Sequence, residues 1–203
     1  MIVYILGAII SYLIGSFNTA FVVSSIKKKN LRSGGSGNLG ASNTAILLGF
    51  KWGVFVALVD ILKGFLVVFI AKMFFADYWL LPFVVSSGAI LGHIFPFYLK
   101  FKGGKGFATL VGCILGYNWI VALIAAVAIA IITISTDYIV IATLSTIVGY
   151  SIYIGIVTHS VYPVLILWIS FICIFIKHIP NIIRIAKKEE IGFRSSFDKK
   201  HKI

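Results

Sequence analysis

Long apolar runs constrain the fold of this chain more than any other feature of its sequence. About 20 apolar helical residues cross a hydrocarbon core of about 30 Å. Strands outside a closed barrel would leave their backbone groups unpaired in lipid, so the runs are expected to be helices. The sequence therefore predicts an all-α, polytopic integral membrane helix bundle of about seven transmembrane helices. The candidate spans are Val3 to Ile26, Gly53 to Phe75, Leu80 to Tyr98, Lys105 to Gly116, Trp119 to Thr136, Tyr138 to Val157 and Ser160 to Ile176, of which the fourth is too short to cross alone if it faces lipid.

The composition supports a membrane location and a phosphorylated ligand. Hydrophobic residues make up 60% of the chain and charged residues 12%, with a mean hydropathy of +1.06, whereas soluble domains are about 45 to 50% apolar and about 25% charged. Lys and Arg number 18 against 6 Asp and Glu. In a membrane protein this excess favours anionic lipid or phosphorylated small molecules over nucleic acid. Cys113 and Cys173 lie in apolar runs, so neither a disulfide framework nor a thiol nucleophile is expected.

The positive charges also predict the orientation and the domain organisation. Seven spans place every Lys and Arg except Lys63 and Lys72 on one side of the membrane, and cytoplasmic loops are enriched in these residues. We therefore expect an external amino terminus, retained as a span rather than cleaved as a signal peptide, and a cytoplasmic carboxyl terminus. A single domain is expected over residues 1–203, with residues 191–203 as a basic tail on anionic headgroups.

Two glycine-rich loops lie on the predicted cytoplasmic side. The first reads LRSGGSGNLGASNT, residues 31–44, and the second FKGGKG, residues 101–106. Glycine lets consecutive N–H groups converge into a nest that suits phosphate oxygens, and each loop opens a helix whose amino end favours an anion. Neither loop fits the nucleotide-binding pattern G-x-x-x-x-G-K-[ST]. The loops predict phosphate binding; the alternative is that they are turns whose lysines only anchor the chain at the membrane surface.

Other polar residues inside the apolar runs have simpler interpretations. Asp60 and Lys63 lie three residues apart on one helix face and are expected to form a structural ion pair. His93, at the end of the third span, is expected to be a hydrogen-bonded helix end rather than a base. The sequence contains no H-E-x-x-H motif, no clustered Cys and His residues and no close carboxylate pair, so no metal site is expected.

The segment after the last span carries a regular polar pattern. In KHIPNIIRIAKKEE, His178, Asn181 and Arg184 recur at three-residue spacing and share a helical face. That face could close over the two loops from a third direction. The alternative is an amphipathic interfacial helix with a solvated charged face.

These motifs together resemble a known family. GHIFPFYLKFKGGKGFAT, residues 92–109, is similar to G-H-x-F-P-x-[FY]-L-x-F-K-G-G-K-G-x-A-T, and GSGNLGASN, residues 35–43, is similar to G-S-G-N-[PI]-G-A-T-N. DILKG and the closing H-x-x-N-I-x-R, with Glu190 after it, complete a resemblance that covers nearly the whole chain. The family is that of the bacterial acyl-phosphate-dependent glycerol-3-phosphate acyltransferases, PlsY.

The resemblance implies an enzyme that transfers a fatty acyl group from acyl phosphate to the 1-hydroxyl of sn-glycerol 3-phosphate. The products would be lysophosphatidic acid and inorganic phosphate, the first step of phospholipid synthesis. It implies no cofactor, a place in the bacterial inner or plasma membrane with the active site facing the cytoplasm, and an association with the enzyme that forms acyl phosphate. The implied catalytic residues are Ser36, Lys105, His178, Asn181 and Glu190; the implied substrate-binding residues are Gly35, Gly37, Asn38, Gly40, Asn43, Lys63, His93, Lys102, Gly103, Gly104, Gly106, Thr109 and Arg184.

The chain departs from the family pattern at a few positions. Ile46 stands where the family has an arginine, and isoleucine replaces neither its charge nor its forked donors. Asn18, Asn30 and Lys188 stand where the family has proline, aspartate and glycine. A divergent paralogue, or a non-enzymatic membrane protein that binds another phosphorylated ligand, is therefore the alternative to an acyltransferase.

Overall fold

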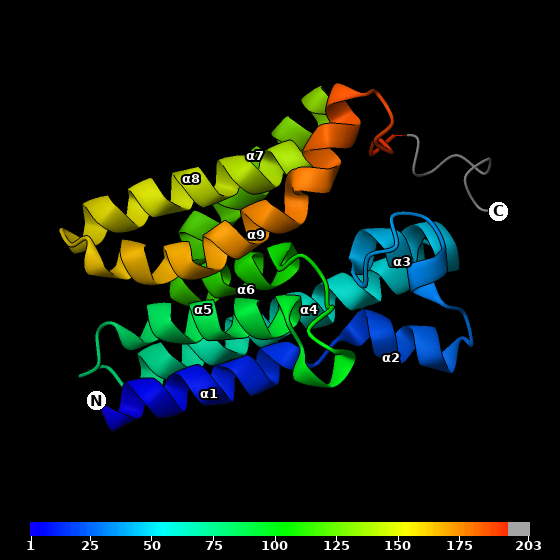
Figure 1. The fold of residues 1–203 in the computed structure, drawn as a ribbon. Coiled ribbons are helices and arrows are strands. Elements are labelled where there is room, and N and C mark those ends of the chain that lie inside the picture. The colour runs from blue at the N-terminus through cyan, green and yellow to red at the C-terminus, as the bar shows by residue number, and fades with distance from the viewer. Residues whose placement is uncertain (195–203) are drawn as a thin grey trace.

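The computed structural model describes residues 1–194, which form a helical bundle without strands (Figure 1). The elements are α1 (Ile2–Ser16), α2 (Thr19–Ile26), η1 (Leu31–Ser33), α3 (Ala41–Leu48), α4 (Phe50–Phe74), α5 (Leu81–Ile94), η2 (Phe97–Leu99), α6 (Phe107–Tyr117), α7 (Trp119–Thr136), α8 (Ile139–Thr158) and α9 (Tyr162–Ala186). The amino terminus lies at one end of the bundle, and α2, α3 and the carboxyl end of α9 lie at the other.

Six helical stretches are long and apolar enough to cross a membrane. They are Ile2–Ile26, Phe50–Phe74, Leu81–Leu99, Trp119–Thr136, Ile139–Thr158 and Tyr162–Ala186. The seventh apolar helix, α6, is shorter and packs against α4, α5 and α7. The predicted class, an all-α multi-pass membrane protein of about seven helices, is confirmed.

The first predicted span is broken in the structure. Helix α1 ends at Ser16, and α2 begins after Asn18, whose side chain accepts a hydrogen bond from the Phe21 N–H (2.8 Å). An asparagine at this position caps a new helix by satisfying one of its unpaired N–H groups. The break exposes the Phe17 carbonyl, which accepts a hydrogen bond from Lys63 Nζ (2.8 Å). The sequence predicted one continuous helix here, and that prediction was wrong.

Glycines bring α4 and α6 into backbone contact. A Cβ atom added at Gly64 would lie 2.2 Å from the Thr109 carbonyl oxygen, and one added at Gly112 would lie 2.0 Å from the Ile61 carbonyl oxygen. Such distances exclude any larger side chain without a shift of the helices. Close approach through small residues is the usual way in which helices associate in lipid. This contact holds the start of α6, where the second glycine-rich loop ends, against α4.

The last apolar span and the polar segment after it form one continuous helix. The sequence placed the end of the final span at Ile176, whereas α9 continues to Ala186. Pro180 lies inside it, and α9 bends near its carboxyl end (Figure 1). Proline removes one backbone hydrogen bond and bends a helix without necessarily ending it. The polar segment that follows the apolar run is therefore a bent extension of the same helix.

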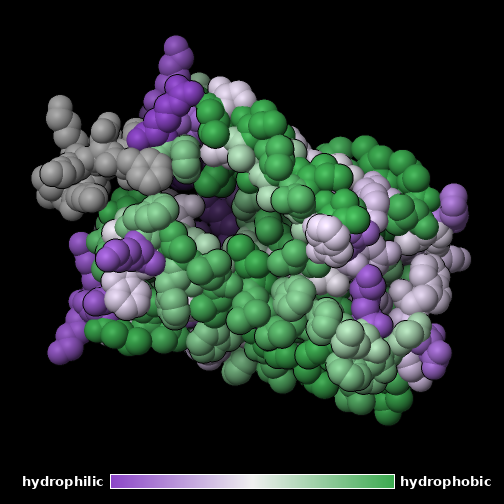
Figure 2. Space-filling view, turned by 180° about the vertical axis from the view of Figure 1, so that it is seen from behind, coloured by the Kyte–Doolittle hydropathy of each residue, from purple (hydrophilic) through white to green (hydrophobic). Residues whose placement is uncertain are grey.

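Much of the outer surface is apolar. Ile124, Ile131 and Ile152 each expose more than half of their surface, whereas Phe83 and Phe171 are buried in the core. Figure 2 shows a largely hydrophobic face with a hollow that has a hydrophilic floor. A lipid-facing surface of this kind concentrates the polar chemistry of the chain in its interior and at its ends.

Candidate active site

A cavity of about 640 Å³ is formed by the two glycine-rich loops, α3, α4, α6, the turn between α7 and α8, and the end of α9. One part of its lining is polar and comes from the loops and α9. The other part is apolar and includes Phe50, Val54, Ala57, Val111 and Ile139. A cavity with one polar and one apolar part can accept an amphiphile with an anionic head.

Asn43 shapes the first loop. Its fully buried side chain donates from Nδ2 to the carbonyl oxygens of Leu31 (2.7 Å) and Asn38 (3.0 Å), and its Oδ1 accepts from the Ser36 N–H (2.8 Å). Gly35 has a φ of +55°, and a Cβ there would lie 2.2 Å from Asn43 Oδ1. Position 35 requires glycine, because its backbone is left-handed and the Asn43 side-chain amide occupies the space that a Cβ would need. Asn43 thus holds the loop in shape.

The second loop is tied to the end of α5. The Gly103 N–H donates to the Ile94 carbonyl (3.0 Å) and the Gly104 N–H to the His93 carbonyl (3.1 Å). Gly106 has a φ of +89° and precedes α6. Arg32 links the two loops, because its Nη2 donates to the Lys102 carbonyl (2.8 Å). The loops that the sequence analysis paired by composition are therefore joined in space.

The Asp60 and Lys63 ion pair predicted from the sequence is present. Lys63 Nζ lies 2.8 Å from Asp60 Oδ1, and both side chains are buried. The ammonium also donates to the Phe17 carbonyl and lies 2.9 Å from His93 Nδ1. Thr19 Oγ1 donates to the same Asp60 oxygen (3.0 Å). This buried cluster ties α2, α4 and α5 together beneath the loops, and Asp60 and His93 from it line the cavity.

The bent end of α9 connects with the second loop. Lys105 Nζ donates to Asn181 Oδ1 (2.5 Å), and Asn181 Nδ2 donates to Glu190 Oε1 (2.6 Å). Glu190 Oε2 accepts from Arg184 Nε (2.6 Å). His178 Nδ1 donates to the Ile174 carbonyl (2.8 Å). Of the two alternatives for this segment, closure over the loops is therefore the one that the structure shows.

Burial controls the charge of Lys105. It lowers the pKa of this lysine from 10.5 to about 8, since an ammonium loses hydration in the cavity wall. The negative charge of Glu190 opposes the effect, and the positive charge of Arg184 adds to it. Lys105 is thus a partly desolvated cation, for which an entering phosphate would supply the missing counter-charge.

The expected site residues divide into two groups. Lining the cavity are Gly35, Ser36, Asn38, Gly40, His93, Lys105, Gly106, His178, Asn181, Arg184 and Glu190. The others do not line it: Asn43, Lys63, Gly104 and Thr109 are buried, Gly37 and Gly103 are partly buried, and Lys102 is exposed. Thr109 is fully buried, and its Oγ1 has no hydrogen-bond partner within residues 1–194. The residues of the second group shape the loops or pack beneath them, whereas those of the first can touch a ligand.

The sequence analysis missed one wall of the cavity. Tyr138, Ile139 and Val140, from the turn between α7 and α8, line it together with residues 191–193. The sequence assigned residues 191–203 to a basic tail, whereas residues 191–194 pack along this wall and the rest of that tail lies outside the described residues. The only signal was the polar run Ser135 to Asp137, which ends one span and separates it from the next; it indicates a turn but not the partner of that turn.

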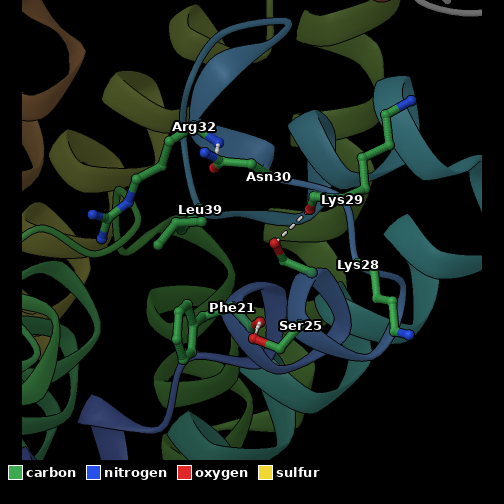
Figure 3. Close-up of a pocket in the computed structure, with 8 residues that line it drawn as sticks. Phe21, Ser25, Lys28, Lys29, Asn30, Arg32 and Leu39 are labelled. Carbon is green, nitrogen blue, oxygen red and sulfur yellow. Dashed lines mark hydrogen bonds between the residues drawn. The ribbon is translucent and has the colours of Figure 1, made fainter.

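A second hollow lies beside α2, lined by Phe21, Ser25, Lys28, Lys29, Arg32 and neighbouring residues (Figure 3). The Lys28 and Lys29 side chains point away from each other and from its centre. Its hydroxyls are bonded to the chain itself, since Ser25 Oγ donates to the Phe21 carbonyl (3.0 Å). Cations that do not converge make a poor phosphate site, so we place the candidate active site in the larger cavity. Within residues 1–194, no group of three or more His, Cys, Asp or Glu side chains could hold a metal ion.

The chain is similar to known proteins over most of its length. The family model described as glycerol-3-phosphate acyltransferase matches residues 5–188. The chain is 33% identical to glycerol-3-phosphate acyltransferase 1 of Oceanobacillus iheyensis, over 97% of this chain and 98% of that protein. It is 39% identical to glycerol-3-phosphate acyltransferase of Staphylococcus saprophyticus, over 90% of this chain and 94% of that protein.

Solved structures show the same fold. The crystal structure of PlsY (YgiH), an integral membrane glycerol 3-phosphate acyltransferase, in its glycerol 3-phosphate form has a TM-score of 0.86 at 32% identity, covering 94% of this chain and 95% of that one. The lysophosphatidic acid form of that protein gives 0.82 at 31% identity, covering 95% and 97%.

The fold and the solved structures that share it define the class, a multi-pass membrane enzyme, here with a cavity at one end of the helical bundle. The family match and the curated relatives make the identification more specific. This chain belongs to the glycerol-3-phosphate acyltransferase family, as its motifs predicted.

Proposed function

We propose that the protein transfers a fatty acyl group from acyl phosphate to the 1-hydroxyl of sn-glycerol 3-phosphate. The observation that carries the proposal is the meeting of three motifs at one cavity. Ser36 and the nearby glycines from the first loop, Lys105 from the second and Asn181 from α9 all line it. The family membership and the glycerol 3-phosphate form of the related PlsY structure support the same substrate.

The chemistry needs charge neutralisation more than a strong nucleophile. Acyl phosphate is already activated, and bringing two anionic heads together is the main obstacle. The Lys105 ammonium supplies positive potential in a poorly hydrated wall of the cavity that the first loop also lines. Asn181 and Glu190 hold Lys105 in place, while His178 and Arg184 flank the same part of the cavity. The apolar part fits the acyl chain.

The proposed reaction balances without a protein base. The 1-hydroxyl oxygen attacks the acyl carbonyl carbon, a new C–O ester bond forms, and the bond between that carbon and the phosphate oxygen breaks. The hydroxyl proton passes to a substrate phosphate oxygen, and inorganic phosphate leaves. Holding the two reactants next to each other supplies much of the rate.

Positive charges support the proposed orientation and location. Lys102 lies in the second loop, Lys100 lies just before it and Arg32 bonds to it, whereas Lys72 lies in the last turn of α4, at the other end of that helix from Phe50, which lines the cavity. The positive-inside rule then directs the active site toward the cytoplasm of a bacterial cell, with the amino terminus outside. We further propose that the enzyme that forms acyl phosphate associates with this basic face, and co-purification of the two from crosslinked membranes tests that association.

The test of function uses the purified protein in detergent. Palmitoyl phosphate and labelled glycerol 3-phosphate are supplied, palmitoyl-CoA serves as the donor control, and labelled lysophosphatidic acid is measured. We expect product from acyl phosphate alone. Lys105→Ala should lower turnover at least a hundredfold, the usual scale for removing one group that stabilises developing charge, while Lys100→Ala, an exposed position just before the loop, should not.

Two results would contradict the proposal. A folded sample that binds glycerol 3-phosphate but forms no product would identify a binding protein or a divergent paralogue. Product formed equally well by the Lys105→Ala protein would remove Lys105 from the mechanism.

A further inference from the structure

Residues 190–194, here called the C-terminal strap, follow the end of α9 and run along the cavity wall. Ile191, Gly192 and Phe193 line the cavity beside Tyr138 and Ile139. The strap begins with Glu190, which accepts hydrogen bonds from Asn181 and Arg184. It therefore connects the polar part of the site with the apolar wall formed by the turn between α7 and α8.

One residue of that turn anchors the far end of the strap. The Phe193 N–H donates to the Asp137 carbonyl (2.7 Å), and the Arg194 N–H donates to Asp137 Oδ1 (2.8 Å). Arg194 Nη2 also donates to the Ile134 carbonyl at the end of α7 (2.7 Å). Asp137 has a left-handed backbone, with a φ of +68°. A short polar side chain tolerates this conformation better than most others.

Only glycine fits at position 192, because the Asp137 carboxylate lies close to its Cα. A Cβ at Gly192 would lie 1.9 Å from Asp137 Oδ2 and 2.7 Å from its Cγ. The carboxylate could turn aside for a larger residue only by leaving the Arg194 N–H. The glycine and the aspartate are thus physically coupled, although 55 positions separate them in the sequence.

The strap is short, so its two ends cannot move independently. Four residue steps span at most about 14 Å when fully extended, and both ends are hydrogen-bonded. Release of the strap at Asp137 would weaken the hydrogen bonds that Asn181 and Arg184 donate to the Glu190 carboxylate. Asn181 in turn accepts a hydrogen bond from Lys105. Release would also move Ile191 and Phe193 out of the apolar wall.

We propose that Asp137 is a positioning residue for acyl transfer. Through the C-terminal strap it sets the position of the Glu190 carboxylate and the width of the apolar part of the cavity. The inference rests on the proposed function. Asp137 lies outside every motif that carries the family resemblance, and it need not touch either substrate.

The first test measures the anchor itself. Amide hydrogen exchange of the strap is compared in the wild type, Asp137→Gly and Asp137→Asn. Glycine keeps the left-handed backbone and the carbonyl acceptor but removes the carboxylate, so the strap should exchange at least tenfold faster. Asparagine retains an oxygen acceptor and tolerates the same backbone, so exchange should stay close to wild type. Asp77→Gly, in the exposed connection after α4, is the matched control.

The second test measures the consequence for catalysis. Asp137→Gly should raise KM for both substrates by about tenfold, as expected when a charge-assisted hydrogen bond no longer holds the closed strap. It should leave kcat within about threefold of wild type, because Lys105 keeps its own hydrogen bond to Asn181. Asp137→Asn should restore KM, and Asp77→Gly should behave as the wild type.

A double-mutant cycle separates coupling from general damage. Gly192→Ala should raise KM in the wild-type background but have little further effect in Asp137→Gly, since the colliding carboxylate is then absent. Unchanged strap exchange in Asp137→Gly would overturn the anchor. Faster exchange with unchanged KM, or additive effects in the cycle, would overturn the positioning role. A wild-type protein that makes no lysophosphatidic acid would instead refute the proposed function, while the exchange experiment would still decide whether Asp137 anchors the strap.

Discussion

The titration of Lys105 should control how activity depends on pH. Burial lowers the pKa of this lysine from 10.5 to about 8, and one pKa unit corresponds to about 1.4 kcal/mol. Charged Lys105 is therefore about 3 kcal/mol less favourable in the wall of the empty cavity than in water. A phosphate dianion offsets that penalty when it binds, so only the protonated lysine favours the substrate.

The sign of the effect follows from this argument. Below pH 8 the ammonium is present, and above pH 8 the neutral amine replaces it. The kcat/KM for glycerol 3-phosphate reports the free enzyme, so it should fall as pH rises through about 8, by about tenfold for each further pH unit. The second pKa of a phosphate monoester lies near 6, so the titration of this substrate affects the acid side of the profile instead.

The assay is the initial rate at subsaturating glycerol 3-phosphate between pH 6 and pH 10, corrected for spontaneous hydrolysis of acyl phosphate. Lys105→Arg is the decisive variant, because a guanidinium stays charged over the whole range. The plateau value of kcat/KM should be lower in this variant, since the branched guanidinium fits the Asn181 contact poorly. The decrease of kcat/KM at alkaline pH should disappear. Lys100→Arg, an exposed cation close to the loop, should keep the wild-type profile. An alkaline fall near pH 8 that persists in Lys105→Arg would refute the assignment.

Three other substitutions test single features of the structure. Lys188 has a left-handed backbone just after α9, with a φ of +59°, so Lys188→Gly should stabilise the protein by about 1 kcal/mol in detergent unfolding; no gain would show that this backbone strain is relieved elsewhere. A Cβ at Gly104 would lie 2.1 Å from His93 Nε2, so Gly104→Ala should cost about 1 to 3 kcal/mol and most of the activity. Gly149→Ala, with nothing within 4 Å, is its control, and equal effects would contradict the packing argument. Ile46 lines the cavity, so Ile46→Arg should raise kcat/KM for glycerol 3-phosphate by about tenfold through one more phosphate contact; an unchanged value would mean that the existing cations suffice.

The parts of the fold that follow from local rules were predictable. The length of each apolar run gave the number of membrane-crossing segments, although not the number of helices, and the three-residue spacing of Asp60 and Lys63 gave their ion pair. The break after α1 could have been found from Asn18, because an asparagine within an apolar run is a cap signal. The helical face after the apolar run was predicted from residue spacing, but its continuity with the last span was not, because hydropathy marks the edge of the membrane rather than the end of a helix.

The site was predictable only where its residues share a motif. The glycines of both loops predicted phosphate nests; the structure brings both loops to one cavity, but the Gly103 and Gly104 N–H groups donate to carbonyls of α5. No pattern indicated which residues of a motif line the cavity and which hold the loop in shape. Asn43 and Ser36 stand in the same short run, but the Asn43 side chain bonds to loop backbone while Ser36 lines the cavity. That difference depends on the direction of each side chain, which composition does not contain.

Contacts between distant segments explain the remaining gap, and α9 shows how it arises. The spacing of His178, Asn181 and Arg184 correctly predicts one polar face, because local helix geometry sets that face. Its partners depend on the bend near Pro180, on the position of Lys105 at the start of α6, and on Glu190 returning after the helix ends. Lys105 is buried only where these three features come together, and burial in that assembled wall is what lowers its pKa. The lowered pKa of Lys105 is therefore a property of the packed bundle, although each residue that contributes to it can be found in the sequence.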